Sequence, residues 1–386
     1  MGGVGVVSAW RFPPGGRGVL RVGAVFAVVA VVVCGGRVPA WGVEEITTQA
    51  YVGVLGVDNA VARGLTGKGV RIGVIDRPVD TSLPELADAD VTVKQMCDFT
   101  TSDVNRSHGS AVVSILAARG YGLARDAQII NYAIPGEGDD SSNCGGGSSV
   151  GGAINAAVAD GVRIISISLA GYLNDALREA VAGAVARGVV VVVGTGNYGS
   201  KDPPGSLASM NGTVGVGASD LGGRISAYSN YGRGLTVLAP VEDFQYHDLG
   251  SGQVVTGPGT SFAAPIVAGM IAVAMQVWPG ASGAQVAQSV VSTATLGPTG
   301  QALVNFPGLI DTDPSGFADE SPVMDKFPGE EPSWETVADY RDGLLGTETV
   351  FDNDPSYVYR GVQENVARGH ADRSALGTSP RYHRRE

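Results

Sequence analysis

Three side chains that can cooperate in chemistry lie at the boundaries of expected strands, turns and helices. Asp76 follows an apolar run at 70–75, His108 precedes a small-residue segment at 109–119, and Ser261 follows the glycine-rich turn at 257–259. A serine hydroxyl can attack a carbonyl, an imidazole can take its proton, and a carboxylate can orient the imidazole. Together the three residue types would form a nucleophilic centre for acyl transfer.

Each residue alone has a plainer interpretation. Asp76 could be a turn acid, His108 a structural histidine at the start of a helix, and Ser261 an ordinary helix N-cap. Two features favour chemistry: Gly109 after His108 permits close approach of backbone, and Pro265 falls in the first turns of its helix, where a missing N–H does little harm. A helix N-terminus beside Ser261 would also offer donors to a developing anion.

A fourth candidate lies in VVVVVGTGNYG at 189–199, which contains the pattern G-x-G-x-x-G. A dinucleotide site requires the third glycine to open a helix whose N-terminus binds pyrophosphate. Here Gly199 is followed by SKDPPG, which favours a loop. The pattern therefore argues against a nucleotide cofactor and leaves the role of Asn197 to be decided by the rest of the chain.

Alternating strand and helix patterns surround these residues and predict an α/β fold, with a mostly parallel sheet covered by helices on both faces. The working groups of such sheets gather at the C-terminal ends of the strands. We expect strands at 70–75, 127–132, 162–168, 189–193, 214–217 and 235–239, and helices at 109–119, 150–160, 175–187, 261–277 and 282–293.

The N-terminal region has the three-part pattern of a secretory signal peptide. Residues 1–40 contain four arginines and no acid. Three of these arginines precede the uncharged run VGAVFAVVAVVVCGG at 22–36, and the small-x-small site VPA lies at 38–40. An uncleaved N-terminal anchor is the alternative. The sequence thus divides into a signal peptide or anchor at 1–40, a catalytic domain at 41–310, and an acidic tail at 311–386 that we expect to be disordered.

The net charge limits the classes of binding partner that we expect, and the cysteine content limits the possible disulfide and zinc sites. Removing residues 1–40 takes away four of 26 basic residues, and 22 against 38 acids leaves a net charge of −16. Such a chain is not expected to bind nucleic acid or an anionic membrane. Cys97 and Cys144 then remain, and an exported chain could bond them, although two free thiols are also possible. No cysteine and histidine spacing indicates zinc.

Several motifs resemble those of the subtilisin-like serine proteases. GTSFAAP at 259–265 resembles their nucleophile motif, HGSAVVSILAA at 108–118 their histidine motif, and GVIDRPVDTSLPEL at 73–86 their aspartate motif. Gly196-Asn197 matches their oxyanion-hole asparagine, SISLAG at 166–171 their substrate strand, and YSNYG at 228–232 a further recurrent segment. The order aspartate, histidine, serine is that of subtilisin, and the resemblance covers about residues 50–300.

The resemblance implies a subtilisin-like three-layer fold and an exported serine endopeptidase, secreted or at the cell surface, acting as a monomer on protein or peptide substrates. It implies Asp76, His108 and Ser261 as catalytic residues and Asn197 as an oxyanion donor. The substrate-binding residues would be Ser168, Leu169, Ala170 and Gly171. It implies no cofactor. Family members often bind structural calcium, but no acidic loop here can be assigned to it.

The chain departs from the family pattern at three places. Arg77-Pro78 replaces the usual Thr-Gly after the aspartate, and Arg77 could pair with Asp76 and compete for His108. Ser110 replaces threonine, and Ala170 replaces glycine. A catalytically inactive relative that serves as a scaffold or peptide-binding protein is therefore the alternative. The short segment before Asp76 leaves no room for a folded pro-segment and resembles the mycosin branch, whose usual C-terminal membrane helix is not found.

Overall fold

The computed structural model of the chain describes residues 44–142, 144, 149–169, 173–203, 205–342 and 345, and the backbone of two short strands at 357–359 and 382–384. The predicted signal peptide or anchor at 1–40 lies outside the described residues. Ala170 and Gly171 of the predicted substrate strand also lie outside them.

A nine-stranded sheet forms the centre of the fold, in the order β10-β11-β7-β6-β5-β4-β1-β3-β2. All neighbouring strands are parallel except the pair β10 and β11. This arrangement confirms the predicted mostly parallel sheet. The strands are β1 (Arg71–Asp76), β2 (Val91–Gln95), β3 (Gln128–Ala133), β4 (Ile164–Ile167), β5 (Val190–Gly194), β6 (Thr213–Ser219), β7 (Val237–Pro240), β10 (Thr295–Leu296) and β11 (Ala302–Leu303).

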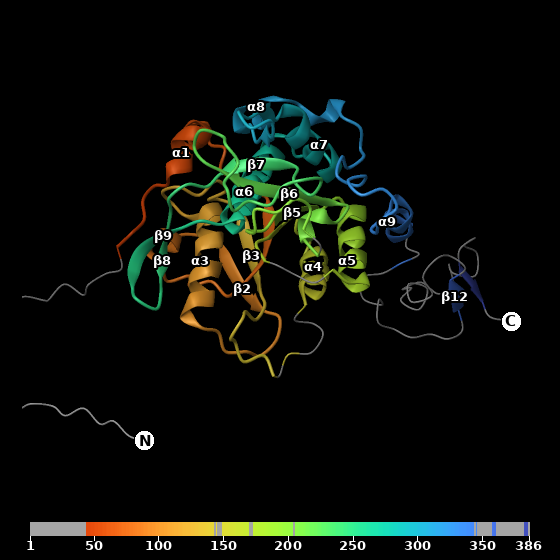
Figure 1. Ribbon diagram of the computed structural model, residues 1–386, viewed down its shortest axis with the longest axis horizontal. Helices are drawn as coiled ribbons and strands as arrows, with labels where there is room; N and C mark the ends of the chain where they lie inside the picture. Colours follow the sequence, from red (N-terminus) through yellow and green to blue (C-terminus); the bar gives the residue numbers. More distant parts are fainter. Residues whose placement is uncertain are drawn as a thin grey trace, which may run out of the picture. The chain divides into compact units, whose positions relative to one another are not determined.

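Helices cover both faces of the sheet because its strands are apolar on both sides. Val190 and Val192 of β5 belong to the core that contains α3 and α6. Val191 and Val193 belong to the opposite core, with α4 and α5. This is the two-residue alternation of a strand between two buried faces. Figure 1 shows α4 and α5 together, away from α3. The helices are α3 (Asp103–Ala117), α4 (Val150–Ala159), α5 (Asp175–Ala186), α6 (Thr260–Val277) and α7 (Gly283–Thr293).

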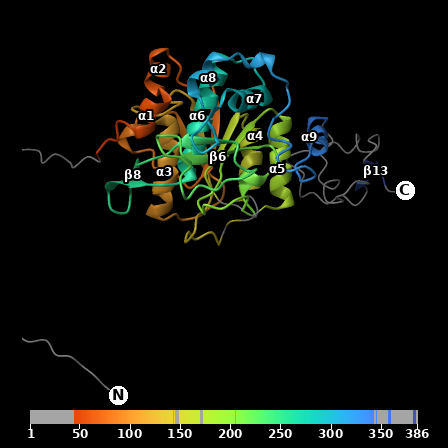
Figure 2. The ribbon, with the colours of Figure 1, turned by 45° about the horizontal axis from the view of Figure 1, so that its top comes forward.

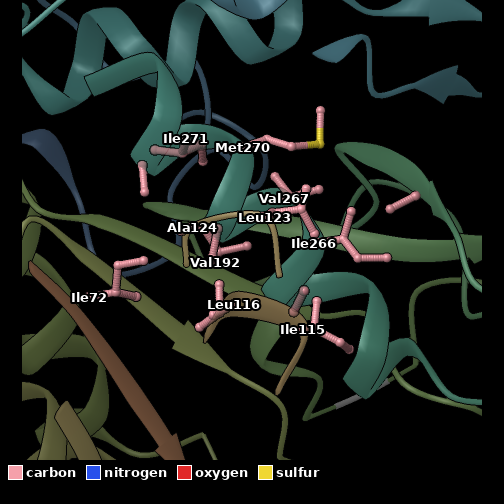
Figure 3. Packing of buried hydrophobic residues seen from close by; sticks show 14 of the residues in the cluster. Ile72, Ile115, Leu116, Leu123, Ala124, Val192, Ile266, Val267, Met270 and Ile271 are labelled. Carbon is pink, nitrogen blue, oxygen red and sulfur yellow. The ribbon is translucent and has the colours of Figure 1, made fainter. Parts of the chain in front are cut away.

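Helix α6 is the main packing element of one face. It is apolar all round and contacts β4, β5 and β6 of the sheet. Figure 3 shows Ile266, Val267, Met270 and Ile271 of α6 among residues of α3 and the sheet. Among the described residues it is the one helix long and apolar enough to cross a membrane, and most of it is buried in the protein core. Its rigid burial holds the helix N-terminus, with Ser261, at a fixed place.

Several elements were not predicted. The N-terminal segment forms α1 (Ala50–Leu55) and α2 (Val57–Ala62), and a hairpin of β8 (Phe244–Asp248) and β9 (Gln253–Gly257) precedes Ser261. The buried Gln49 side chain donates to the carbonyl of Gln245 at 2.8 Å and accepts from its N–H at 3.0 Å, which ties the N-terminal segment to this hairpin.

The chain stays folded beyond residue 310, which corrects the predicted tail for residues 311–342. Helix α8 (Phe306–Asp311) is followed by α9 (Trp334–Arg341), which packs against α5. Val337, Tyr340 and Leu345 form a small apolar cluster with Ala182 of α5. Figure 2 shows α9 beside α5. The segment has few apolar residues of its own, and it folds because it docks on the sheet domain. Except for Leu345, the side chains of the later tail lie outside the described residues.

The two cysteines that remain after residue 40 are bonded to each other. Cys97 and Cys144 form a disulfide with a Cα–Cα distance of 5.2 Å, which closes a separation of 47 residues. Cys97 follows β2 and Cys144 lies in the glycine- and serine-rich stretch at 136–152. The bond therefore fastens this loop to the edge of the sheet.

Candidate active site

The predicted aspartate and histidine meet at the end of β1. Asp76 is the last residue of β1 and is fully buried, and its Oδ1 lies 2.7 Å from Nδ1 of His108. An ionised carboxylate can only accept, so Nδ1 must carry the proton that it shares with Asp76. The tautomer of neutral His108 is thereby set, with Nε2 unprotonated and able to act as a base.

His108 does not begin its helix, contrary to the prediction from sequence. Helix α3 starts at Asp103, with Ser102 as its N-cap, so His108 lies in the second turn. The helix packs closely on the chain after Asp76. A Cβ placed on Gly109 would lie 2.3 Å from the carbonyl oxygen of Arg77. Only glycine fits at that distance, so this residue permits the approach of the histidine to the aspartate.

The surroundings of His108 raise its pKa above the usual 6.5. Burial acts against the charged form and lowers the pKa, but the charge of Asp76 and its hydrogen bond more than compensate. The charge of Arg77 opposes protonation to a smaller extent. Asp76 thus favours the imidazolium, which is the form that a histidine takes when it has removed a proton from a nucleophile.

Arg77 does not compete for the aspartate in the way that the sequence suggested. Its guanidinium lies against the backbone carbonyls of Ile134 and Pro135. Its backbone N–H donates to Oδ1 of Asp76 at 2.7 Å, so the residue supports the carboxylate that orients His108. An ion-pair contact joins Asp76 to His108. In the described part of the chain, no ion-pair contact joins Asp76 to the guanidinium of Arg77.

Ser261 is the second residue of α6, whose N-cap is Gly259, so the serine does not cap the helix. Its hydroxyl donates to the carbonyl of Ser168 at 3.1 Å, and the hydroxyl of Ser168 donates to the carbonyl of Ser261 at 2.7 Å. This reciprocal pair fixes the start of α6 against the end of β4. The predicted nucleophile and Ser168, the first of the predicted substrate-binding residues, are therefore neighbours.

Asn197 is held by Thr260, which was not among the predicted site residues. Oδ1 of Asn197 accepts from the backbone N–H of Thr260 at 2.9 Å and from its hydroxyl at 3.0 Å. A backbone N–H can only donate, so the oxygen of the amide must face Thr260 and Nδ2 must point away. The Thr260 hydroxyl in turn accepts from the N–H of Gly196 at 2.9 Å. In the sequence, the position of Thr260 directly before the predicted nucleophile Ser261 is the one feature that could have indicated its role in the site.

A cavity of about 520 Å³ connects these groups. Ser168, Leu169, Asn197 and Ser261 line it, and the remaining wall is uncharged. The other lining residues are Gly194, Thr195, Gly196, Tyr198, Pro203, Gly205, Ser206, Leu207, Asn230 and Thr260. A long neutral side chain of a ligand would fit such a cavity better than a charged one, because no described lining residue could pair with a charge.

Phe262 connects the Asp76–His108 pair with the part of the site that contains Ser261. Its ring centroid lies 6.2 Å from that of His108, and Phe262 follows Ser261 directly. In the described part of the chain no hydrogen bond joins His108 to Ser261, since the serine hydroxyl is bonded to Ser168. Catalytic hydrogen bonds often form only when substrate is bound. The arrangement brings an oriented base, a hydroxyl and an amide donor to the C-terminal ends of the strands β1, β4 and β5.

The G-x-G-x-x-G segment does not form a dinucleotide turn. The chain continues from β5 through Gly199 as a loop, and the next helical residues are the short turn η3 (Leu207–Ser209). Within the described ranges, no three or more histidine, cysteine, aspartate or glutamate side chains are grouped as metal ligands.

Comparison with known proteins identifies the family. The model of the subtilase family, Peptidase_S8, matches residues 67–312. The chain is 33% identical over 284 residues to an alkaline protease of Alkalihalobacillus alcalophilus, covering 68% of this chain and 70% of that protein. It is 32% identical to Subtilisin Savinase of Lederbergia lenta, covering 69% and 96%. The chain belongs to the subtilase family, and it is a serine-type endopeptidase.

Solved structures agree with this assignment. The self-cleaved protease domain of PatA is 28% identical, with a TM-score of 0.54, over 64% of this chain and 97% of that chain. The PatG macrocyclase in complex with peptide has a TM-score of 0.57 at 21% identity, over 66% and 94%, which shows the shared fold alone. The predicted subtilisin-like fold is confirmed.

Proposed function

We propose that this subtilase is an exported endopeptidase that cleaves polypeptides with Asp76, His108 and Ser261 as catalytic residues and Asn197 as an oxyanion donor. The observation that carries the proposal is the 2.7 Å contact between Asp76 and His108, whose ring lies 6.2 Å from that of Phe262, the residue that follows Ser261. Asn197 and Ser261 line one cavity. Base, nucleophile and donor come from three separate segments, and packing of the sheet domain holds each of them.

The proposed reaction is acyl transfer to Ser261. Substrate turns the Ser261 hydroxyl from Ser168 toward Nε2 of His108, which takes the proton as the oxygen attacks the carbonyl. Nδ2 of Asn197 and the backbone N–H of Ser261 stabilise the oxyanion. His108 then protonates the leaving amine, and water releases the acyl group by the same steps. The carboxylate of Asp76 stabilises the imidazolium throughout.

The substrate is a protein or peptide in extended conformation, lying along the segment 166–171 as an added strand. The side chain on the amino-terminal side of the cleaved bond enters the cavity of about 520 Å³, which is supported by its position beside Ser261 and Asn197. Its uncharged wall favours large apolar residues such as leucine or phenylalanine over lysine or aspartate. The enzyme would act as a monomer, without a cofactor.

Export is supported by the signal-like residues 1–40 and by the disulfide between Cys97 and Cys144, since disulfides persist in oxidising compartments. The placement in the mycosin branch stays a prediction.

Treatment of the purified protein with EDTA, followed by thermal unfolding, tests whether a calcium ion contributes to stability.

The test is digestion of an unfolded protein by the purified wild type and by Ser261→Ala, with cleavage sites identified by mass spectrometry. We expect internal cleavage after large apolar residues by the wild type and none by the variant. A folded wild-type protein that binds peptides without cleaving them would overturn the proposal and establish the inactive relative instead. Cleavage by Ser261→Ala that persists through further purification would show that another residue is the nucleophile and would also overturn the proposal.

A further inference from the structure

Asn230 contacts the backbone on both sides of Asn197. It is buried, with 2% of its surface exposed, and its Nδ2 donates to the carbonyl of Thr195 at 2.9 Å. Its Oδ1 accepts from the N–H groups of Tyr198 at 3.0 Å and Ser200 at 3.1 Å. The segment 195–200 is thus bound to one side chain 30 or more residues later in the sequence.

The backbone of Asn230 adds a fourth bond, because its N–H donates to the carbonyl of Gly196 at 2.9 Å. Segment 195–200 leaves the sheet at the end of β5 and forms no helix, so its buried polar groups need partners from elsewhere. An asparagine side chain has both a donor and an acceptor, and here both kinds of group are used. Neither alanine nor aspartate could satisfy the same three backbone groups.

The Asn230 side chain packs tightly against the backbone of Gly196. Gly196 has φ +98°, and a Cβ on it would lie 2.5 Å from Nδ2 of Asn230. Gly199 donates its N–H to the carbonyl of Tyr228 at 2.7 Å. The segment 228–230 therefore holds the loop before and after Asn197, while Thr260 holds the Asn197 side chain itself.

We propose that Asn230 is a positioning residue for the oxyanion hole: it fixes the backbone that carries Asn197, and through it the direction of the Asn197 Nδ2 donor. This inference rests on the proposed role of Asn197. Donors stabilise an oxyanion because they are aligned before charge develops, and a displacement of about 1 Å can cost roughly 100-fold in rate. Loss of Asn230 therefore lowers the rate of the chemical step more than substrate binding.

The experiment measures kcat and KM of the full chain with an apolar peptide substrate for Asn230→Ala, Asn230→Asp, Asn197→Ala and the double variant Asn230→Ala/Asn197→Ala. We expect Asn230→Ala to lower kcat by about 10- to 100-fold, with KM changed by less than about threefold. Asn230→Asp keeps the acceptor for Tyr198 and Ser200, so we expect an intermediate loss. In the Asn197→Ala background we expect Asn230→Ala to cost less than about threefold, because the donor that it aligns is absent.

Asn211→Ala is the matched control. Asn211 is equally buried and binds the backbone of Phe327 and Glu330, so its loss tests the effect of removing a buried asparagine elsewhere. We expect it to lower the unfolding temperature while kcat stays within about twofold of the wild type. If Asn230→Ala does not fold, Asn230→Asp supplies the comparison.

Losses that multiply in the double variant, or a kcat of Asn230→Ala and Asn230→Asp equal to that of the wild type, would overturn the inference. Labelling of the wild type by a fluorophosphonate separates this failure from failure of the proposed function. A labelled wild type with an indifferent Asn230 removes the positioning role alone, whereas an unlabelled wild type removes the protease mechanism.

Discussion

At the scale of single residues, the site depends on hydrogen bonds whose direction is determined by chemistry. The carboxylate of Asp76 can only accept, which leaves Nε2 of His108 unprotonated and available as the proposed base. The N–H of Thr260 can only donate, which turns Nδ2 of Asn197 outward. Neither result depends on the substrate, so the proposed base and the proposed oxyanion donor are oriented before substrate binds.

The raised pKa of His108 leads to a pH prediction. A base with a raised pKa stays protonated to higher pH, so kcat/KM should rise with pH through an apparent pKa above 6.5. In Asp76→Asn the charge that raises the pKa is lost, so this acid limb should move to lower pH. The rate should also fall by about 10⁴-fold, because the tautomer is no longer enforced. A pH series with a peptide substrate measures both, and a wild-type limb below 6.5 would contradict the account.

Removal of the proposed oxyanion donor gives a second prediction. Asn197→Ala should lower kcat by about 100- to 1,000-fold with little change in KM, because the donor acts only on the developing anion. This range is the one known for the oxyanion-hole asparagine of subtilisin. Steady-state kinetics with one peptide substrate measures it. An increase in KM at unchanged kcat would show that Asn197 binds the substrate ground state instead.

At the scale of elements, helix α3 approaches the end of β1 only because residue 109 is glycine. Gly109→Ala would place a Cβ 2.3 Å from the Arg77 carbonyl and 2.7 Å from that of Pro78. Backbone cannot yield as a flexible side chain would, so we expect destabilisation by about 1–3 kcal/mol and a separation of His108 from Asp76. Urea unfolding and peptide hydrolysis measure the two effects.

Gly53 in α1 is the matched control, because a Cβ there meets no heavy atom within 4 Å. We expect Gly53→Ala to stabilise the protein by about 0.5–1 kcal/mol and to leave activity unchanged. Equal effects of the two substitutions would show that the close approach of α3 to β1 has no consequence.

The elements that carry the site were predictable, and the reason lies in burial. Strand β5 was predicted within a residue of its bounds because a strand buried on both faces is a run of valines. Strand β2, mostly exposed at the edge of the sheet, gave no such run and was missed. The start of α3 was misplaced because its first turn is polar. Asn230 could not be assigned a role, because its partners lie some 30 residues away and are backbone groups without a sequence pattern.

At the scale of the whole described molecule, the C-terminal segment belongs to the folded unit. Asn211 donates to the carbonyls of Phe327 and Glu330, and its Oδ1 accepts from the N–H of Phe327 at 2.9 Å. These bonds join the segment to the turn that follows Leu207, a residue of the cavity wall. The sequence could not reveal this docking, because the segment has no apolar periodicity of its own.

The docking of α9 on α5 buries an acid and should therefore weaken as pH rises. Burial raises the pKa of Glu179 to about 7, a hydrogen bond from Tyr340 opposes the rise, and nearby Glu331, Asp175 and Asp339 add to it. Because the folded pKa exceeds the usual 4.5, stability is fully present below 4.5 and is lost as pH rises through about 7. We expect Glu179→Gln to remove this loss. Thermal unfolding of both proteins from pH 5 to 8 measures it, and parallel pH dependences would refute the assignment to Glu179.

The central claim is that Ser261 is a nucleophile activated by His108. The most direct measurement is labelling of the purified protein with a fluorophosphonate, with the modified residue mapped by mass spectrometry and with Ser261→Ala and His108→Ala measured alongside. The account predicts a single label on Ser261 in the wild type and loss of labelling in both variants. A folded wild-type protein that stays unlabelled, or a label on a different serine, would contradict it.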